Sequence, residues 1–81
     1  MNEQDILSHI NGIFIDILKR NNLNIELSTS AADVDGWDSL THMILIDKIE
    51  SHFKIKFKLK EIMKFNNIGD MVLTIQQKLN P

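Results

Sequence analysis

The sequence has 81 residues and contains no cysteine, no tyrosine, one proline, one tryptophan and three glycines. Without cysteine, the chain can form neither a disulfide framework nor a thiolate metal site. Any thiol chemistry must therefore use a thiol that a cofactor supplies. The three glycines lie far apart, so the sequence holds no glycine-rich phosphate-binding loop.

Long apolar runs are also missing, and none approaches membrane-spanning length. The first five residues are polar or acidic apart from Met1, unlike a secretory signal peptide. We therefore expect a cytoplasmic, monomeric protein without stable membrane insertion. The histidines His9, His42 and His52 show no metal-ligand spacing, so we expect no metal site.

Charge is unevenly divided along the chain, whose net charge is −2. Residues 1–37 carry two cations and six carboxylates, whereas residues 38–81 carry seven lysines and five carboxylates. Because the overall balance is acidic and arginine occurs only once, we expect no nucleic-acid partner. The lysines that alternate through residues 54–60 are interpreted as a solvated charged face.

Helical periodicity is clear in three segments of this chain, which is 43% hydrophobic. Residues 6–18 and 68–79 each carry one apolar stripe, as amphipathic helices do. Residues 39–53 carry two apolar stripes on opposite sides: Leu45, Ile46, Ile49 and Phe53 on one, and Leu40, Met43 and Ile44, continued by Asp47 and Ser51, on the other. The second stripe is either a partner-binding surface or the second buried side of a central helix.

The segment between the first two helices, residues 21–37, shows no sustained helical period. Leu23, Ile25 and Leu27 alternate there with polar residues, which fits either a short strand or an extended loop pinned to the core. A connection of this length is uncommon in a compact domain and is usually functional or disordered. Since this one leads to Ser39, we expect it to be functional.

A second ambiguous segment is residues 53–60, where apolar residues and lysines alternate strictly. This pattern favours either an amphipathic strand or an extended connection with Phe57 and Leu59 turned inward. Residues 61–65 can close into one or two helical turns. The residues alone thus indicate one small domain with three main helices, one short helix and a long first loop.

The run Gly36-Trp37-Asp38-Ser39-Leu40 places a serine where a helix begins. Free backbone N–H groups and the helix dipole favour an anion at that point, which suits a serine that carries a phosphate. Asp38 and Ser39 are also typical capping residues, and capping alone is the simpler interpretation. Trp37 is either a hydrophobic staple ahead of the cap or part of a partner surface.

Asp38, Ser39 and His42 together suggest a nucleophilic hydrolase, because Ser39 and His42 lie three residues apart on one helix. The sequence has no Gly-x-Ser-x-Gly elbow and no recognisable oxyanion-hole segment. A chain of 81 residues also has little room for a substrate pocket. We therefore expect no catalytic residues and no enzymatic activity of its own.

The chain resembles the acyl carrier protein family in four features. They are Asp38-Ser39-Leu40, the amphipathic helix that follows, Phe53 near the end of that helix, and a last helix that begins at Ile68. The resemblance covers essentially the whole chain as one acyl carrier domain, residues 1–81. It implies an all-α four-helix bundle with a short third helix and a long loop between helices 1 and 2. The implied helices span residues 3–20, 39–53, 59–65 and 68–79, which replaces the strand interpretation of residues 53–60.

The resemblance also implies a cofactor. Ser39 would receive 4′-phosphopantetheine from coenzyme A through a phosphopantetheinyl transferase, with Asp38 orienting the serine. The arm ends in a thiol that holds an acyl group as a thioester, which agrees with the absence of cysteine. The implied partner-binding residues, which would meet an acyl-loading ligase and acyl-transferring or synthase enzymes, are Trp37, Leu40, Met43, Ile44 and Asp47.

The chain departs from carriers of fatty acid synthesis, which usually present acidic residues along the second helix. Ile44 stands where a carboxylate is common, and four lysines follow Phe53 within seven residues. We therefore expect a specialised lipid, polysaccharide or secondary-metabolite pathway. Two alternatives stay open: an aminoacyl carrier of the peptidyl or D-alanyl type, and a helical interaction module without a cofactor.

Overall fold

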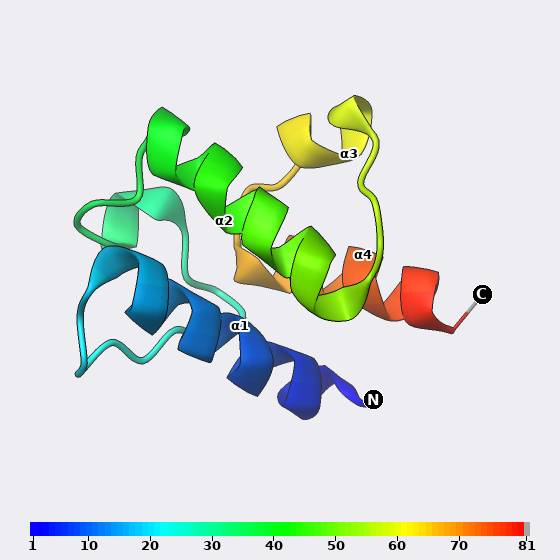
Figure 1. Cartoon of the computed structure of the whole chain (residues 1–81), viewed down its shortest axis with the longest axis horizontal. Coiled ribbons are helices and arrows are strands. Elements are labelled where there is room, and N and C mark those ends of the chain that lie inside the picture. The colour runs from blue at the N-terminus through cyan, green and yellow to red at the C-terminus, as the bar shows by residue number, and fades with distance from the viewer. Residues whose placement is uncertain (81) are drawn as a thin grey trace.

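The computed structural model describes residues 1–80, which form four α helices and no strand. In chain order, the helices are α1 (Glu3–Leu18), α2 (Ser39–Phe53), α3 (Leu59–Met63) and α4 (Ile68–Leu79). A short 3-10 turn, η1 (Ala31–Asp33), lies inside the loop between α1 and α2. Helix α1 packs against both α2 and α4 (Figure 1). The predicted all-α four-helix fold with a short third helix and a long first loop is confirmed.

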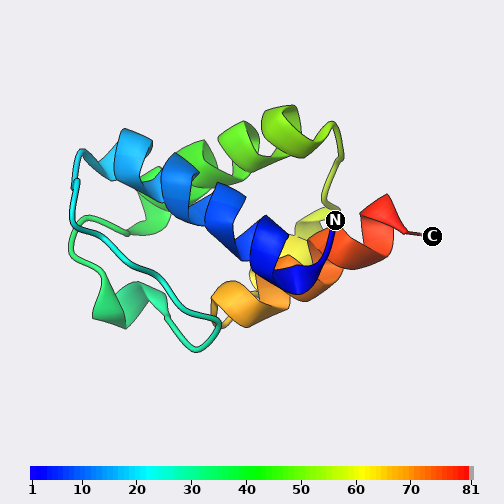
Figure 2. The same cartoon turned by 90° about the horizontal axis from the view of Figure 1, so that it is seen from below.

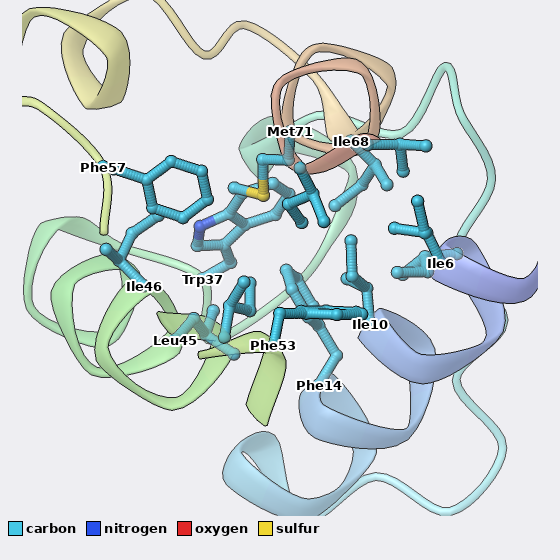
Figure 3. Close-up of a cluster of buried hydrophobic side chains, with 14 of the residues drawn as sticks. Ile6, Ile10, Phe14, Trp37, Leu45, Ile46, Phe53, Phe57, Ile68 and Met71 are labelled. Atoms are coloured by element: carbon cyan, nitrogen blue, oxygen red, sulfur yellow. The ribbon is translucent and has the colours of Figure 1, made fainter. Parts of the chain in front are cut away.

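The core is built from one apolar stripe of each long helix (Figure 3). Its members include Ile10 and Phe14 from α1, Leu45 and Ile49 from α2, and Ile75 from α4. The predicted inner stripe of α2 is buried along its whole length. Interlocking these stripes supplies the hydrophobic free energy that holds so small a domain together.

Helices α1 and α3 each end two residues before the predicted boundary. Lys19 adopts a left-handed conformation with φ of 58°, and its N–H donates to the Ile15 carbonyl, so α1 stops at Leu18. The N–H of Lys64 donates to the Glu61 and Ile62 carbonyls and closes α3 after Met63. Both ends are local turn geometries that the apolar spacing does not encode.

Residues 54–58 form an irregular connection, not a strand. Lys54 has φ of 58°, which ends α2 in a left-handed turn, and the Phe57 N–H then donates to the Glu50 carboxylate at 2.8 Å. Phe57 is buried as expected, and its ring meets Phe65 edge-on at 5.3 Å. The expectation for Leu59 is wrong, because this residue begins α3 with 68% of its surface exposed.

The long loop between α1 and α2 is an extended connection tied to its neighbours, not a strand (Figure 2). Ile25 is buried, and its N–H donates to the Asn11 side chain on α1 at 2.9 Å. Two residues further on, the Leu27 carbonyl accepts from Gly69 N–H at 2.8 Å, which fastens the loop to the first turn of α4. These contacts hold the middle of the loop against α1 and α4.

Candidate functional site

The N-terminus of α2 is held by a reciprocal capping box. The Asp38 carboxylate accepts from the Thr41 N–H at 2.9 Å, and the Thr41 hydroxyl oxygen accepts from the Asp38 N–H at 2.8 Å. The same hydroxyl donates to the Gly36 carbonyl at 2.6 Å. Gly36 has φ of 90°, a conformation that favours glycine, and its turn aims the chain into α2.

Ser39 is the first residue of this helix and is exposed. Within the part of the chain that the structure describes, its hydroxyl has no hydrogen-bond partner. The Asp38 carboxylate is engaged by Thr41, which lowers the pKa of Asp38 and keeps it charged. Asp38 therefore caps the helix that Ser39 begins, and among the described residues it makes no direct hydrogen bond to the serine.

An open hollow of about 540 Å³ lies beside Ser39. It is formed by η1, by the start of α2 with the two residues before it, and by the turn between α3 and α4, which is distant from both in sequence. Its lining residues are Ala31, Trp37, Asp38, Ser39, His42, Met43, Phe65 and Asn66. A hollow that combines apolar and polar side chains next to a free hydroxyl is a typical small-molecule binding feature.

Trp37 lies in the core at the base of this hollow, with only 8% of its surface exposed (Figure 3). Its indole meets the Phe14 ring edge-on at 5.0 Å, and its Nε1–H donates to His42 Nδ1 at 3.0 Å. This burial corrects the prediction that Trp37 belongs to the partner surface. The large apolar ring is instead used to anchor the loop to α1.

The contacts of His42 are not those of a catalytic triad. Its Nδ1 accepts from Trp37, while the Asp38 carboxylate accepts from Thr41, so no acid orients the imidazole toward Ser39. Burial lowers the pKa of His42, which favours the neutral ring. The arrangement lacks the parts that a serine hydrolase needs.

The second apolar stripe of α2 is exposed, which rules out a helix buried on both sides. Leu40 is 73% exposed, and Met43 and Ile44 are also exposed. Asp47, one turn further along, is exposed as well. A contiguous apolar strip that starts beside Ser39 is thus free to contact another molecule.

The remaining histidines form a pair that their sequence spacing does not reveal. His9 Nδ1 on α1 and His52 Nε2 on α2 lie 2.8 Å apart. Among residues 1–80, no group of three or more histidine, cysteine or acidic side chains is placed to hold a metal ion. No helix in the same range combines the length and apolar character that a bilayer span requires.

Comparison with known proteins shows the family. The family model described as "Phosphopantetheine attachment site" matches residues 8–75, so the chain belongs to this family. Its fold is similar to the solution NMR structure of the holo acyl carrier protein from Geobacter metallireducens, with 40% identity and a TM-score of 0.86. That similarity covers 91% of this chain and 85% of the other, and within its family the chain is an acyl carrier protein. No curated protein sequence matches it.

The cofactor of this family is a covalently attached 4′-phosphopantetheine, and the site fits it. The fit rests on the free Ser39 hydroxyl in the first turn of α2, where a phosphodiester is favoured, and on the hollow beside it. The family assignment overturns the alternative of a helical interaction module without a cofactor.

Proposed function

We propose that Ser39 is the attachment residue and that the whole chain, residues 1–81, acts as one monomeric carrier domain without catalysis of its own. The arm's thiol holds an acyl group as a thioester and presents it to partner enzymes. One observation carries this proposal: Ser39 has an exposed, unpartnered hydroxyl at the start of α2, directly beside the hollow. A long flexible arm then gives one cargo a high effective concentration at several enzymes.

The proposed partner surface is the exposed strip of α2 formed by Leu40, Met43, Ile44 and Asp47. It is continuous with Ser39, so an enzyme seated on it reaches the arm at its root. The transferase that installs the arm, the ligase that loads the acyl group and the enzymes that receive it would all use this strip. Apolar groups at its centre favour partners with an apolar docking groove.

Charge supports a specialised pathway over housekeeping fatty acid synthesis. Ile44 supplies no carboxylate, and Glu50 is turned inward to the Phe57 amide, so Asp47 is the main exposed acid of α2. Partners that select carriers by negative charge will meet this chain more slowly, since rim charges set encounter rates. A dedicated ligase or acyltransferase of lipid, polysaccharide or secondary-metabolite synthesis fits better.

Loading with matched donors tests the function. A promiscuous transferase is given either a medium-chain acyl-coenzyme A or an aminoacyl-coenzyme A, and the product is followed by intact mass and NMR. We expect neutral hydroxylamine to remove the acyl mass and leave the arm in place. We also expect the acyl form, and not the aminoacyl form, to shift the signals of Met43 and Phe65, with those of Leu73 on α4 unmoved.

Two results would contradict parts of this proposal. If the acyl and aminoacyl forms shifted the NMR signals of Met43 and Phe65 equally, the preference for an acyl cargo would be lost and the aminoacyl alternative would return. A loaded mass that resists hydroxylamine would show that the cargo is not held as a thioester.

A further inference from the structure

The imidazole of His42 has one ring nitrogen fixed by the fold. The Trp37 Nε1–H lies 3.0 Å from His42 Nδ1. An indole N–H can only donate, so Nδ1 is the acceptor in the neutral ring and carries no proton there. The hydrogen of the neutral ring is therefore on Nε2. Among the described residues, nothing accepts a hydrogen bond from Nε2, which leaves one donor uncommitted beside the hollow.

His42 also lies on the same side of α2 as Ser39. Residues three apart on a helix are neighbours, with Cβ atoms about 5–6 Å apart. Both side chains line the hollow, together with Met43 and Phe65. A group attached to the Ser39 hydroxyl therefore starts within reach of the imidazole.

We propose that His42 is a positioning residue for the prosthetic group, with its Nε2–H donating to the phosphodiester on Ser39 while Trp37 holds the ring in the required tautomer. This inference rests on the proposed attachment at Ser39. It gives the buried tryptophan a role beyond packing, because its indole N–H determines which ring nitrogen of His42 is the donor. The phosphate end of the arm is then held against α2 while the thiol end stays free.

The electrostatics of the hollow give a measurable consequence. Asp38 is the one charged residue lining it within residues 1–80, and its carboxylate is committed to Thr41. The lining residues from η1 and the α3–α4 turn, Ala31, Phe65 and Asn66, do not titrate. Burial lowers the pKa of His42 in the protein without the arm. A phosphodiester anion next to the ring favours the imidazolium and raises that pKa relative to the apo protein. Protonation of Nδ1 at low pH then breaks the hydrogen bond from Trp37.

The test compares His42 in the apo and holo proteins. Loading is first verified by intact mass, and the ring signals of all three histidines are then followed by NMR across the pH range. We expect the pKa of His42 to rise on loading by roughly half a unit or more, as one unit charge about 6 Å away gives in water. His9 and His52 are internal controls, since His52 lies about 20 Å along α2 from Ser39.

A variant tests the tautomer separately from the cofactor. In the apo protein at high pH, we expect nitrogen shifts that show His42 protonated on Nε2 alone. Trp37→Phe keeps a ring against Phe14 but removes the N–H donor, so His42 should become a mixture of both tautomers. Retained helical circular dichroism and a cooperative melt establish that the variant is folded.

The outcomes separate this inference from the proposed function. If the mass shows the arm on Ser39 but the pKa of His42 does not move, the positioning role is wrong and the attachment stands. If His42 carries its proton on Nδ1 in the wild-type protein, the role assigned to Trp37 is wrong. If no arm is added, both the attachment and this inference fail.

Discussion

The side chains of Asp38 and Thr41 each accept a hydrogen bond from the other residue's backbone N–H across the first turn of α2, at 2.9 and 2.8 Å. The Thr41 hydroxyl also donates to the Gly36 carbonyl, so one side chain joins the turn, the cap and the helix. This arrangement fixes the backbone on both sides of Ser39. The position of the candidate attachment residue is therefore a property of the cap, not of the serine itself.

Replacing Thr41 with valine tests the contribution of this cap. Thr41→Val keeps the shape of the side chain but removes the hydroxyl, and we expect the free energy of unfolding to fall by about 1 kcal/mol. The matched control is Thr74→Val on α4, where the hydroxyl makes no hydrogen bond among the described residues. Urea denaturation measures both variants, and equal losses would show that the cap contributes nothing specific.

The pH dependence of stability should carry the signature of His42. Because burial lowers its folded-state pKa below the usual value of about 6.5, the folded protein holds this proton less tightly than the unfolded chain. The contribution of His42 to the free energy of unfolding is therefore complete above about pH 6.5 and is lost as the pH falls below that value. We expect the stability of the apo protein to fall more steeply below that pH than the stability of His42→Gln. Parallel curves would contradict the assignment.

Two glycines should respond in opposite directions to the same substitution. A Cβ at Gly69 would lie 3.0 Å from the Leu27 carbonyl oxygen, a backbone atom already bound to Gly69 N–H. We expect Gly69→Ala to lower the free energy of unfolding by roughly 1–3 kcal/mol. A Cβ at Gly12 on α1 meets nothing within 4 Å, so Gly12→Ala should raise it by about 0.5–1 kcal/mol. Destabilisation by both would show that α1 has less space than described.

Partner selection should change with a single charge on α2. We expect Ile44→Glu to raise kcat/KM with housekeeping fatty acid enzymes on the order of threefold to tenfold, because the rim charge speeds encounter. Leu73→Glu is the control, since Leu73 is similarly exposed but lies on α4. Initial rates at two ionic strengths measure the effect, and a gain that is unchanged by salt would argue against an electrostatic cause.

The sequence predicts the parts of this fold that depend on local spacing. The inner stripes of the long helices and the cap at Asp38 follow from residue type and a period of 3.6, and the structure bears them out. The alternation in residues 53–60 is misleading because it suggests an amphipathic strand. A strand needs a partner to pair with, and the local pattern does not show whether the fold supplies one. There, the contact between Glu50 and Phe57 determines the chain path, with Leu59 left outside.

The candidate site is only partly visible in the sequence for the same reason. Ser39 and the exposed stripe of α2 can be found from one helix and its cap. The burial of Trp37 depends on Phe14, a residue on another helix, and the hollow joins η1, α2 and the α3–α4 turn. The pairing of His9 with His52 likewise spans two helices. No local signal encodes these long-range contacts, although the three-residue spacing of Ser39 and His42 does indicate that they are neighbours.

The most direct test of the central claim is intact mass after incubation with coenzyme A and a promiscuous phosphopantetheinyl transferase. Ser39→Ala is measured beside Ser51→Ala, which removes another exposed serine of the same helix. We predict that the wild-type protein and Ser51→Ala each gain one phosphopantetheine, and that Ser39→Ala gains none. An unchanged gain in Ser39→Ala would contradict the assignment of Ser39 as the residue that carries the arm.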